Sequence, residues 1–395
     1  MRWFSSGAHG RQFLLVDIGS ASVGAAGVVV LHDGRAVVSF SEREPITVAV
    51  ALEPKHFFSA TLHALRALIA RVLKESRAES AVAARVHVFL HAPWIVSKTR
   101  SVRADFPEPT VLSESSLASV VHEAEKGIAE NFRAAHREVA EAVCVVEKKI
   151  TEYRVNGYEV ASAVGQKAET LELTLLESFA PETASRHFTA TLHALSGAPV
   201  EWHGAAAACA GALMGLAHEQ GDALTVSFGG EATEVCIARR GVLHEIVSLP
   251  LGIHTLARAA VEAGAAHSVS AAEALLRAPS LASLADARRA GVAAARAAAA
   301  ERFRRAVMGL LAPKIKVGFA PPRGVLLADA KDAPFYERAF CATAPRAKEL
   351  SLPVCAVRGA DAFAPAVQFF RSASPDTFLA GEAAFVALYE EGRKL

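Results

Sequence analysis

The sequence contains the stretch Val16-Asp17-Ile18-Gly19-Ser20-Ala21-Ser22-Val23, in which a buried-type strand runs into an Asp, a Gly and hydroxyl residues. β-Branched residues on both sides predict strands over 13–18 and 23–31, joined by a tight turn, and a third strand over 36–40. The backbone N–H groups of such a turn can hold an anion, and an Asp at the strand end can hold the water of a metal ion. The same residues also fit an ordinary hairpin whose Asp caps the turn.

A second stretch repeats this pattern and reads Val226-Ser227-Phe228-Gly229-Gly230-Glu231-Ala232-Thr233. The strands expected around it cover 223–228, 233–238 and 242–249. Each set of three strands is followed by helical periodicity, over about 58–72 in the first case and within 251–311 in the second. A strand-turn-strand-strand-helix unit therefore occurs twice, which predicts two related α/β halves.

Composition and charge restrict the class of protein. The chain has 395 residues, of which 52% are hydrophobic and 21% are charged, with a formal net charge of +1. These values predict two or three globular domains and do not favour a polyanion-binding protein. The five cysteines form no CxxC pair, so neither a zinc motif nor a disulfide framework is indicated, and a cytoplasmic protein is expected. The apolar run 14–31 includes Asp17 and several glycines, which favours strands over a membrane span.

The segment between the two repeats has its own pattern. A strand near 86–90, a Pro-rich loop and a helix that begins after Ser113 come first. The strands that follow are expected over 142–150, 153–160 with a turn at Asn156-Gly157, and 170–177, and a helix is expected over 182–195. The predicted division of the chain is a first half over 1–83, an inserted α+β subdomain over 84–198, and a helical return plus the second half over 199–395.

Two glycine turns that face each other across a cleft are typical of the actin-like ATPase superfamily. With the inserted segment, the chain resembles the FtsA/PilM branch of that superfamily over about residues 13–327. Three further segments resemble the branch: Tyr153-Arg154-Val155-Asn156-Gly157-Tyr158, Leu249-Pro250-Leu251-Gly252-Ile253-His254 and Ala272-Glu273-Ala274-Leu275-Leu276-Arg277. The resemblance implies an α/β, duplicated actin-like (ribonuclease-H-like) fold whose inserted subdomain has the order strand-helix-strand-strand.

The resemblance also implies a site for ATP with Mg²⁺ between the two halves. The residues that match the family's nucleotide-binding positions are Asp17, Gly19, Ser20, Ser22, Gly229, Gly230, Thr233, Glu273 and Arg277. No catalytic residue is expected among them, because the family's catalytic acid is missing from the segment 202–205, and no metal ligand is expected either.

Further departures from the family pattern lie at the same site. The family's phosphate-loop Lys corresponds to Gly24, its metal-water Asp to Ser227, and the third glycine of its second loop to Glu231. Residues 328–331 replace a Gly-Gly pair beside the adenosine. A carboxylate about 4 Å from a phosphate is repelled by several kcal/mol in a medium of low dielectric. Phosphoryl transfer needs metal, cation and positioning together, so the site is predicted to be vestigial and the ATPase activity lost.

The function expected from these observations is a non-catalytic scaffold of a membrane-associated bacterial machine, for cell division (FtsA-like) or type IV pilus assembly (PilM-like). Such a scaffold would bind a cytoplasmic peptide of a membrane protein or a cytoskeletal partner, and could self-associate. The end of the chain, residues 385–395, is short and contains two acids, which makes it a poor membrane anchor, so recruitment to the inner face of the membrane would require a partner.

Two other functions remain open at this stage. An active ATP-dependent enzyme of the actin and sugar-kinase superfamily would bind ATP and supply a catalytic acid. A nucleic-acid-binding protein would use the basic segment 281–316, although a solvated helix surface also explains that segment. The sequence has no GxSxG elbow and no HExxH motif, which argues against serine hydrolase and zinc protease chemistry.

Overall fold

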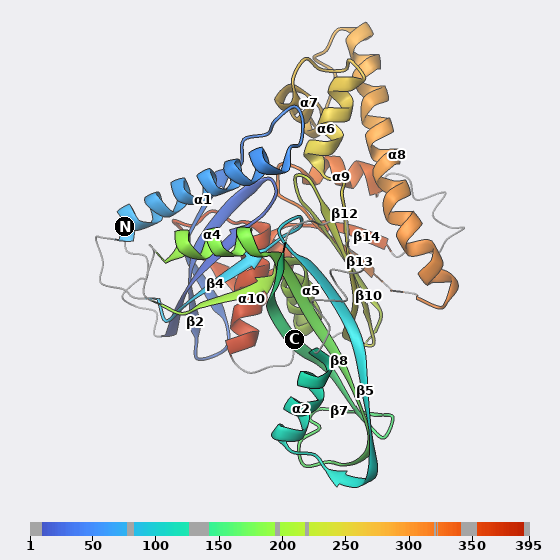
Figure 1. Ribbon diagram of the computed structural model, residues 1–395. Helices are drawn as coiled ribbons and strands as arrows, with labels where there is room; N and C mark the ends of the chain where they lie inside the picture. The colour runs from blue at the N-terminus through green and yellow to red at the C-terminus, as the bar shows by residue number, and fades with distance from the viewer. Residues whose placement is uncertain are drawn as a thin grey trace.

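The computed structural model describes residues 10–76, 83–125, 142–193, 198–217, 221–319, 321, 323–340 and 354–390. Its two halves and an inserted lobe are seen in Figure 1, where the lobe extends downward from the two halves. Among the described residues, no helix is both long enough and apolar enough to cross a membrane.

The first half is built on a six-stranded sheet with the order β15-β3-β2-β1-β4-β9. Its strands are β1 (Gly10–Ile18), β2 (Ser22–Leu31), β3 (Ala36–Pro45), β4 (Arg85–Leu90), β9 (Val200–Gly204) and β15 (Val367–Phe369). Strands β1, β2 and β3 form an antiparallel meander, and β4 and β9 continue the sheet in parallel from β1.

The second half repeats this topology in a five-stranded sheet with the order β12-β11-β10-β13-β14. Its strands are β10 (Ala223–Phe228), β11 (Thr233–Arg239), β12 (Val242–Leu249), β13 (Arg323–Leu327) and β14 (Val354–Arg358). The meander β10-β11-β12 corresponds to β1-β2-β3, and β13 and β14 continue in parallel. The prediction of a duplicated actin-like fold is thus confirmed.

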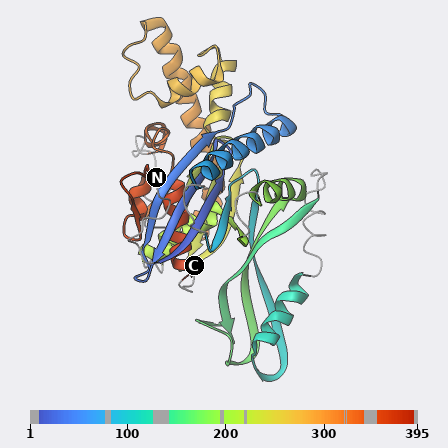
Figure 2. The ribbon, with the colours of Figure 1, turned by 90° about the vertical axis from the view of Figure 1, so that its left-hand side faces the viewer.

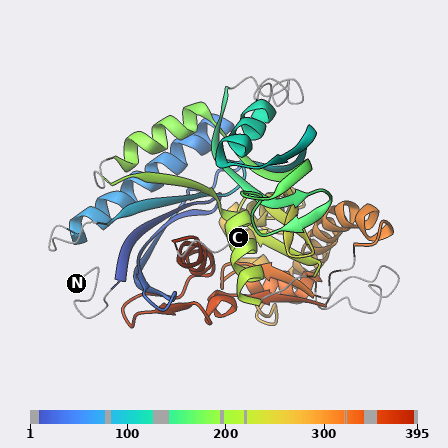
Figure 3. The same ribbon diagram turned by 90° about the horizontal axis from the view of Figure 1, so that it is seen from below.

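Helices cover the sheets on both faces. Those of the first half are α1 (Pro54–Ser76), α4 (Glu182–Leu192), α5 (Ala205–Ala217) and α10 (Thr377–Glu390). Because successive side chains of a strand point to opposite faces, Leu14 and Val16 pack with α1 and α4, whereas Phe13 and Leu15 pack with α5 and α10. Figure 3 shows α10 between the two sheets.

The second half has its own helical layer and apolar core. Its helices are α6 (Ile253–Glu262), α7 (Val269–Arg277), α8 (Asp286–Lys316), α9 (Ala333–Phe340) and the short 3-10 helix η2 (Ala360–Phe363), which packs on α10. Leu224, Val226 and Phe228 of β10 pack with the helices α6 to α9. The helical region expected within 251–311 is therefore three helices, α6, α7 and α8.

The inserted lobe consists of a four-stranded sheet, β5-β8-β6-β7, and the helix α2. Its elements are β5 (Val96–Val111), α2 (Glu114–Glu125), β6 (Val143–Val155), β7 (Tyr158–Val160) and β8 (Lys167–Pro181). The long strands β5 and β8 project away from both halves (Figure 2). The turn expected at Asn156-Gly157 is present, with φ values of 53° and 82°.

Three local assignments differ from the sequence analysis. The strand at 86–90, expected to open the inserted subdomain, is β4 and pairs with β1 in the first sheet. The helix expected at 182–195 corresponds to α4. It was expected in the inserted subdomain, but it packs on the first sheet beside α1. The strands expected at 142–150 and 153–160 are not separate units, since β6 runs without interruption from 143 to 155. Local sequence patterns do not show which sheet a strand joins, because pairing is a long-range interaction.

Candidate functional site

The two glycine turns lie in direct contact. Each turn is closed by the same type of backbone bond, from Gly19 N–H to Ser22 O and from Gly229 N–H to Ala232 O. The N–H of Glu231 donates to Ser20 Oγ over 3.0 Å. A Cβ atom on Gly229 would lie 2.9 Å from Ser20 Oγ. The glycines are therefore needed for the close approach of the turns, and protein atoms fill the space between them at this point.

Asp17 lies at the end of β1 and is only 1% exposed. Its Oδ2 is 2.8 Å from Arg43 Nη1, and its Oδ1 is 3.2 Å from His91 Nε2. Arg43 Nη1 also donates to Ser22 Oγ over 2.9 Å, while its Nε and Nη2 hold both oxygens of Asp376. Burial opposes ionisation of Asp17, but Arg43 and His91 outweigh it and lower the pKa of this carboxyl.

Arg43 takes up the space that Gly24 leaves open. The two residues are paired between β2 and β3, and a Cβ atom on Gly24 would lie 3.1 Å from Arg43 Cζ. The family's phosphate-loop Lys corresponds to Gly24, so the positive charge here comes from the neighbouring strand. That charge is already matched by the carboxylates of Asp17 and Asp376.

His91 connects the two halves of the molecule. Its Nδ1 is 3.2 Å from Glu234 Oε2 on β11, and its Nε2 faces Asp17. Burial opposes protonation of His91, but Asp17 and Glu234 raise its pKa well above the usual value. The nearby Glu382 is fully buried, and burial together with Asp17 raises its pKa well above the usual value. Both cations of the site, Arg43 and His91, are therefore already paired with carboxylates of the protein.

Two of the predicted site residues, Glu273 and Arg277, belong to a second network, which includes Glu231 of the second turn. Glu231 pairs with Arg258 and lies 3.4 Å from His254 Nδ1. His254 Nε2 is 3.2 Å from Glu273, whose other oxygen is 2.8 Å from Arg277 Nη1. The carboxylate of Glu231, expected to repel phosphate, is thus compensated within the protein.

Thr233 has a structural contact, since its hydroxyl donates to the carbonyl of Leu251 over 2.7 Å. The structure thus brings Asp17, Gly19, Ser20, Ser22, Gly229 and Gly230 to the region where the two halves meet. The other predicted site residues, Thr233, Glu273 and Arg277, contact residues of the second half.

The sequence analysis missed Arg43, His91, Asp376 and Glu382. His91 could have been suspected, since it directly follows the buried strand β4, which lies parallel to β1 and ends beside Asp17. Parallel strands that end together place the residues after them at one edge of the sheet. No local signal marks the other three, because Arg43 and Asp376 are 333 residues apart in sequence.

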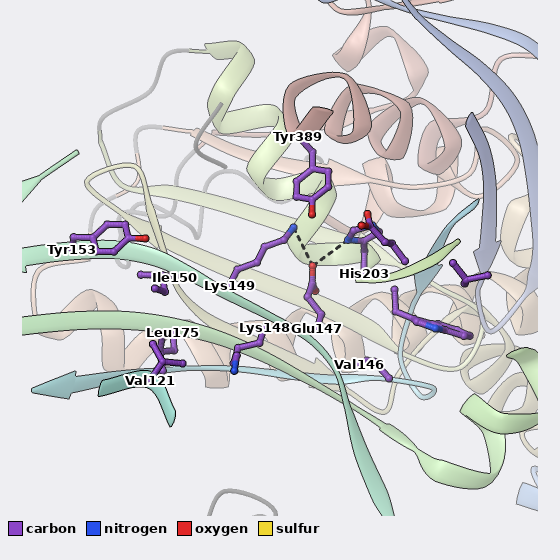
Figure 4. A pocket seen from close by; sticks show the side chains of 13 residues that line it. Val121, Val146, Glu147, Lys148, Lys149, Ile150, Tyr153, Leu175, His203 and Tyr389 are labelled. Atoms are coloured by element: carbon purple, nitrogen blue, oxygen red, sulfur yellow. Dashed lines mark hydrogen bonds and ion pairs between the residues drawn. The ribbon is translucent and has the colours of Figure 1, made fainter. Parts of the chain in front are cut away.

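A pocket of about 670 Å³ lies between the inserted lobe and the first half (Figure 4). It is lined by Val121, Val146, Glu147, Lys148, Lys149, Ile150, Tyr153, Leu175, Val200, Glu201, Trp202, His203 and Tyr389. Its polar end is organised around Glu147, which is 3.1 Å from Lys149 Nζ and 3.3 Å from His203 Nδ1. Burial opposes ionisation of Glu147, but Lys149 and His203 lower its pKa to about 2.

The strand β9 forms one wall of this pocket. Within the part of the chain that the structure describes, β9 pairs only with β4, so its other edge faces β6 across the pocket. An unpaired strand edge beside apolar side chains can accept a further strand, through backbone hydrogen bonds and side-chain contacts.

Known structures were compared with this geometry. No protein-family model matches the sequence, and no curated protein matches it. The solved PilM–PilN type IV pilus biogenesis complex contains a chain that is 16% identical, with a TM-score of 0.61, over 96% of this chain and 98% of that one.

Two weaker structural matches are a Bacteroides thetaiotaomicron protein with an actin-like ATPase fold and the ethanolamine utilization protein EutJ of Carboxydothermus hydrogenoformans. The first has a TM-score of 0.46 and 9% identity over 95% and 96% of the two chains. The second has a TM-score of 0.43 and 12% identity over 95% and 89%. The repeated strand order, together with the match to PilM, identifies the chain as a protein with the duplicated actin-like ATPase fold.

Proposed function

We propose that the chain is a non-catalytic, actin-fold scaffold of a type IV pilus-like bacterial machine. It acts by holding a cytoplasmic peptide of a membrane protein, which recruits it to the inner face of the membrane. The observation that carries the proposal is the pocket between β6 and β9, where apolar side chains lie beside a polar end and beside an edge of β9 that pairs with no other described strand.

The loss of catalysis is supported by the way the two turns meet. Phosphates between the turns would have to displace the Ser20–Glu231 hydrogen bond. The cations nearby are engaged as well, Arg43 by Asp17 and Asp376, and His91 by Asp17 and Glu234. Phosphoryl transfer relies on cations that are available to the phosphates, so this arrangement favours a structural role over an ATP-dependent enzyme.

The choice of partner is supported by the chemistry of the pocket. An extended peptide could add to the edge of β9 and place apolar side chains against Ile150, Tyr153 and Trp202. The similar PilM chain was solved in a complex with PilN, so a PilN-like membrane protein is the partner proposed here. A cytoskeletal partner in cell division, as for FtsA, is the runner-up.

The nucleic-acid alternative receives less support from α8. Basic residues of this helix that contact other protein groups are Arg289, Arg296, Arg304, Arg305 and Lys314. Intramolecular ion pairs and helix-capping contacts reduce the charge available to a phosphate backbone.

Peptide binding provides the direct test. A fluorescein-labelled peptide of the cytoplasmic segment of the same organism's PilN-like protein should bind the full chain with a saturable rise in anisotropy. Tyr153→Ala should weaken binding about tenfold or more, because buried tyrosines often dominate peptide interfaces. Tyr158→Ala is the matched control, since Tyr158 lies on the same lobe but is 76% exposed and does not line the pocket. Equal binding by both variants would contradict the proposed pocket.

Calorimetry with MgATP tests the non-catalytic part separately. We expect a Kd weaker than about 1 mM and no hydrolysis above background. Micromolar binding would favour the ATP-dependent enzyme, whatever the outcome of the peptide experiment.

A further inference from the structure

His87, Glu201 and His203 bring three metal-ligand atoms together at the polar end of the pocket. His87 lies on β4 and the other two on β9, where His87 is directly opposite Glu201 in the parallel register. His87 Nδ1 is 3.0 Å from His203 Nε2 and 3.6 Å from Glu201 Oε2. All three ligand atoms lie within 4.8 Å of one another.

Two of these separations are close to those of a tetrahedral zinc site. Zinc binds imidazole nitrogen and carboxylate oxygen at roughly 2.0–2.2 Å, which places two tetrahedral ligands about 3.3–3.5 Å apart. The observed 3.0 and 3.6 Å lie on either side of this value. We propose that His87, Glu201 and His203 form a binding site for Zn²⁺.

Two of the three proposed ligands, Glu201 and His203, are oriented by an outer partner, as is usual for zinc ligands. Arg85 Nη1 is 3.0 Å from Glu201 Oε1, which leaves Oε2 directed at the histidines. Glu147 Oε1 lies 3.3 Å from His203 Nδ1. Glu390 Oε1 lies 3.6 Å from His87 Nε2, which is too far for a hydrogen bond, so among the described residues this nitrogen has no hydrogen-bond partner. Carboxylates behind histidines fix the ring orientation and make the ligating nitrogens more basic.

A hydrogen bond between the two histidines would explain only part of this arrangement. A proton shared by His87 Nδ1 and His203 Nε2 satisfies both nitrogens. It leaves Glu201 Oε2 without a partner, and among the described residues this buried oxygen accepts no hydrogen bond. A metal ion satisfies all three atoms at once.

The site is buried but has access to the pocket. His87 is fully buried, whereas Glu201 and His203 line the cavity of about 670 Å³. Three protein ligands and one side open to a cavity are typical of zinc sites that bind water or an exogenous group in the fourth position. The surrounding carboxylates of Glu147, Glu201 and Glu390 are matched by Lys149, Arg85 and Arg11, so the ion would enter a nearly neutral cluster. The inference does not depend on the peptide proposed above.

No sequence motif indicates this site, and no metal ligand was predicted from the sequence. His87 and His203 are 116 residues apart and meet only because β4 and β9 are neighbours in the sheet.

The test uses the full, tag-free chain, stripped with a chelator and titrated with ZnCl₂ by calorimetry and with CoCl₂ by visible absorption. We expect one Zn²⁺ per chain and the intense visible bands of tetrahedral cobalt. Glu201→Gln should weaken the binding of Zn²⁺ and of Co²⁺ by at least about tenfold, because the removal of a mere outer partner of a zinc ligand already causes a loss of that size. Glu301→Gln is the matched control, since Glu301 is 35% exposed, close to the 31% of Glu201, and pairs with Arg304 and Arg305 on α8 of the second half.

Several results would overturn the inference. They are the absence of zinc binding to the natural chain, equal binding by the natural chain and Glu201→Gln, and loss of binding in Glu301→Gln. His203→Gln should abolish the cobalt bands. If that variant does not fold, Glu201→Gln still decides the question. This variant should fold, because Glu201 is partly exposed and Gln has nearly the same size as Glu.

Discussion

Replacing Arg43 by Met should remove the cation that holds Asp17 in the interior. Arg43 Nη1 is 2.8 Å from Asp17 Oδ2, and two further guanidinium nitrogens hold Asp376 at 2.7 and 2.9 Å. Asp17 is 1% exposed, so water cannot replace the lost partner. Asp376 is partly exposed and can be hydrated. The main cost of the substitution therefore falls on Asp17.

The magnitude follows from this burial. Removing one partner of a buried ion pair costs about 3–5 kcal/mol of unfolding free energy, because the other charge stays buried and unpaired. His91 remains 3.2 Å from Asp17, so we expect the lower end, about 3 kcal/mol. If the first half unfolds as a unit of about 150 residues, its Tm should fall by roughly 6–12 °C.

The assay is urea and thermal unfolding followed by tryptophan fluorescence. Trp94 is a suitable reporter, because its Nε1 donates to the carbonyl of Gly19 in the first turn. Arg35→Met is the matched control, since Arg35 pairs with Asp33 where both side chains are more than half exposed. Such a surface pair contributes about 0–1 kcal/mol.

The double variant Arg43→Met with Asp17→Asn should regain part of the stability, since it no longer buries an unpaired carboxylate. If Arg43→Met lost no more stability than Arg35→Met, the conclusion that Arg43 stabilises the buried Asp17 would be refuted.

Two further predictions concern buried groups without hydrogen-bond partners among the described residues. The pKa of Glu382 is raised well above 4.5 by burial and by Asp17, so the folded chain keeps a proton that the unfolded chain has lost above pH 4.5. The contribution of the protonated Glu382 carboxyl to the free energy of unfolding is fully present below pH 4.5 and is lost as pH rises through the pKa that this carboxyl has in the folded chain. The stability of Glu382→Gln relative to the natural chain should therefore increase as pH rises, by up to about 1.4 kcal/mol per pH unit. The measurement is the difference between the urea midpoints of the variant and the natural chain, and an equal difference at pH 5 and pH 8 would contradict this prediction. The hydroxyl of Tyr336 is buried, and its ring stacks on Phe228 with centroids 3.7 Å apart. Tyr336→Phe should keep the stack and raise the unfolding free energy by about 1 kcal/mol. A clear decrease of the unfolding free energy measured with urea would contradict this prediction, because it would mean that the hydroxyl has a hydrogen-bond partner.

The hairpins of the two halves could be predicted from the sequence because their signals are local. Alternating apolar residues and glycine turns specify the meanders β1-β2-β3 and β10-β11-β12 without reference to the rest of the chain. The strand β4 was assigned to the wrong unit, because its apolar run is compatible with either neighbouring sheet and only the pairing with β1 distinguishes them.

The candidate sites divide in the same way. Asp17, Ser20, Gly229 and Gly230 were recognisable, since each belongs to a turn whose residues are consecutive in sequence. The contact between the two turns depends on how the two halves pack against each other. The residue types in the turns do not specify the distance between them. Arg43 reaches Asp376 across 333 residues, and His87 reaches His203 across 116. Such contacts result from the folding of distant strands and helices into shared layers, so only the tertiary structure determined which charges are paired and where ligands converge.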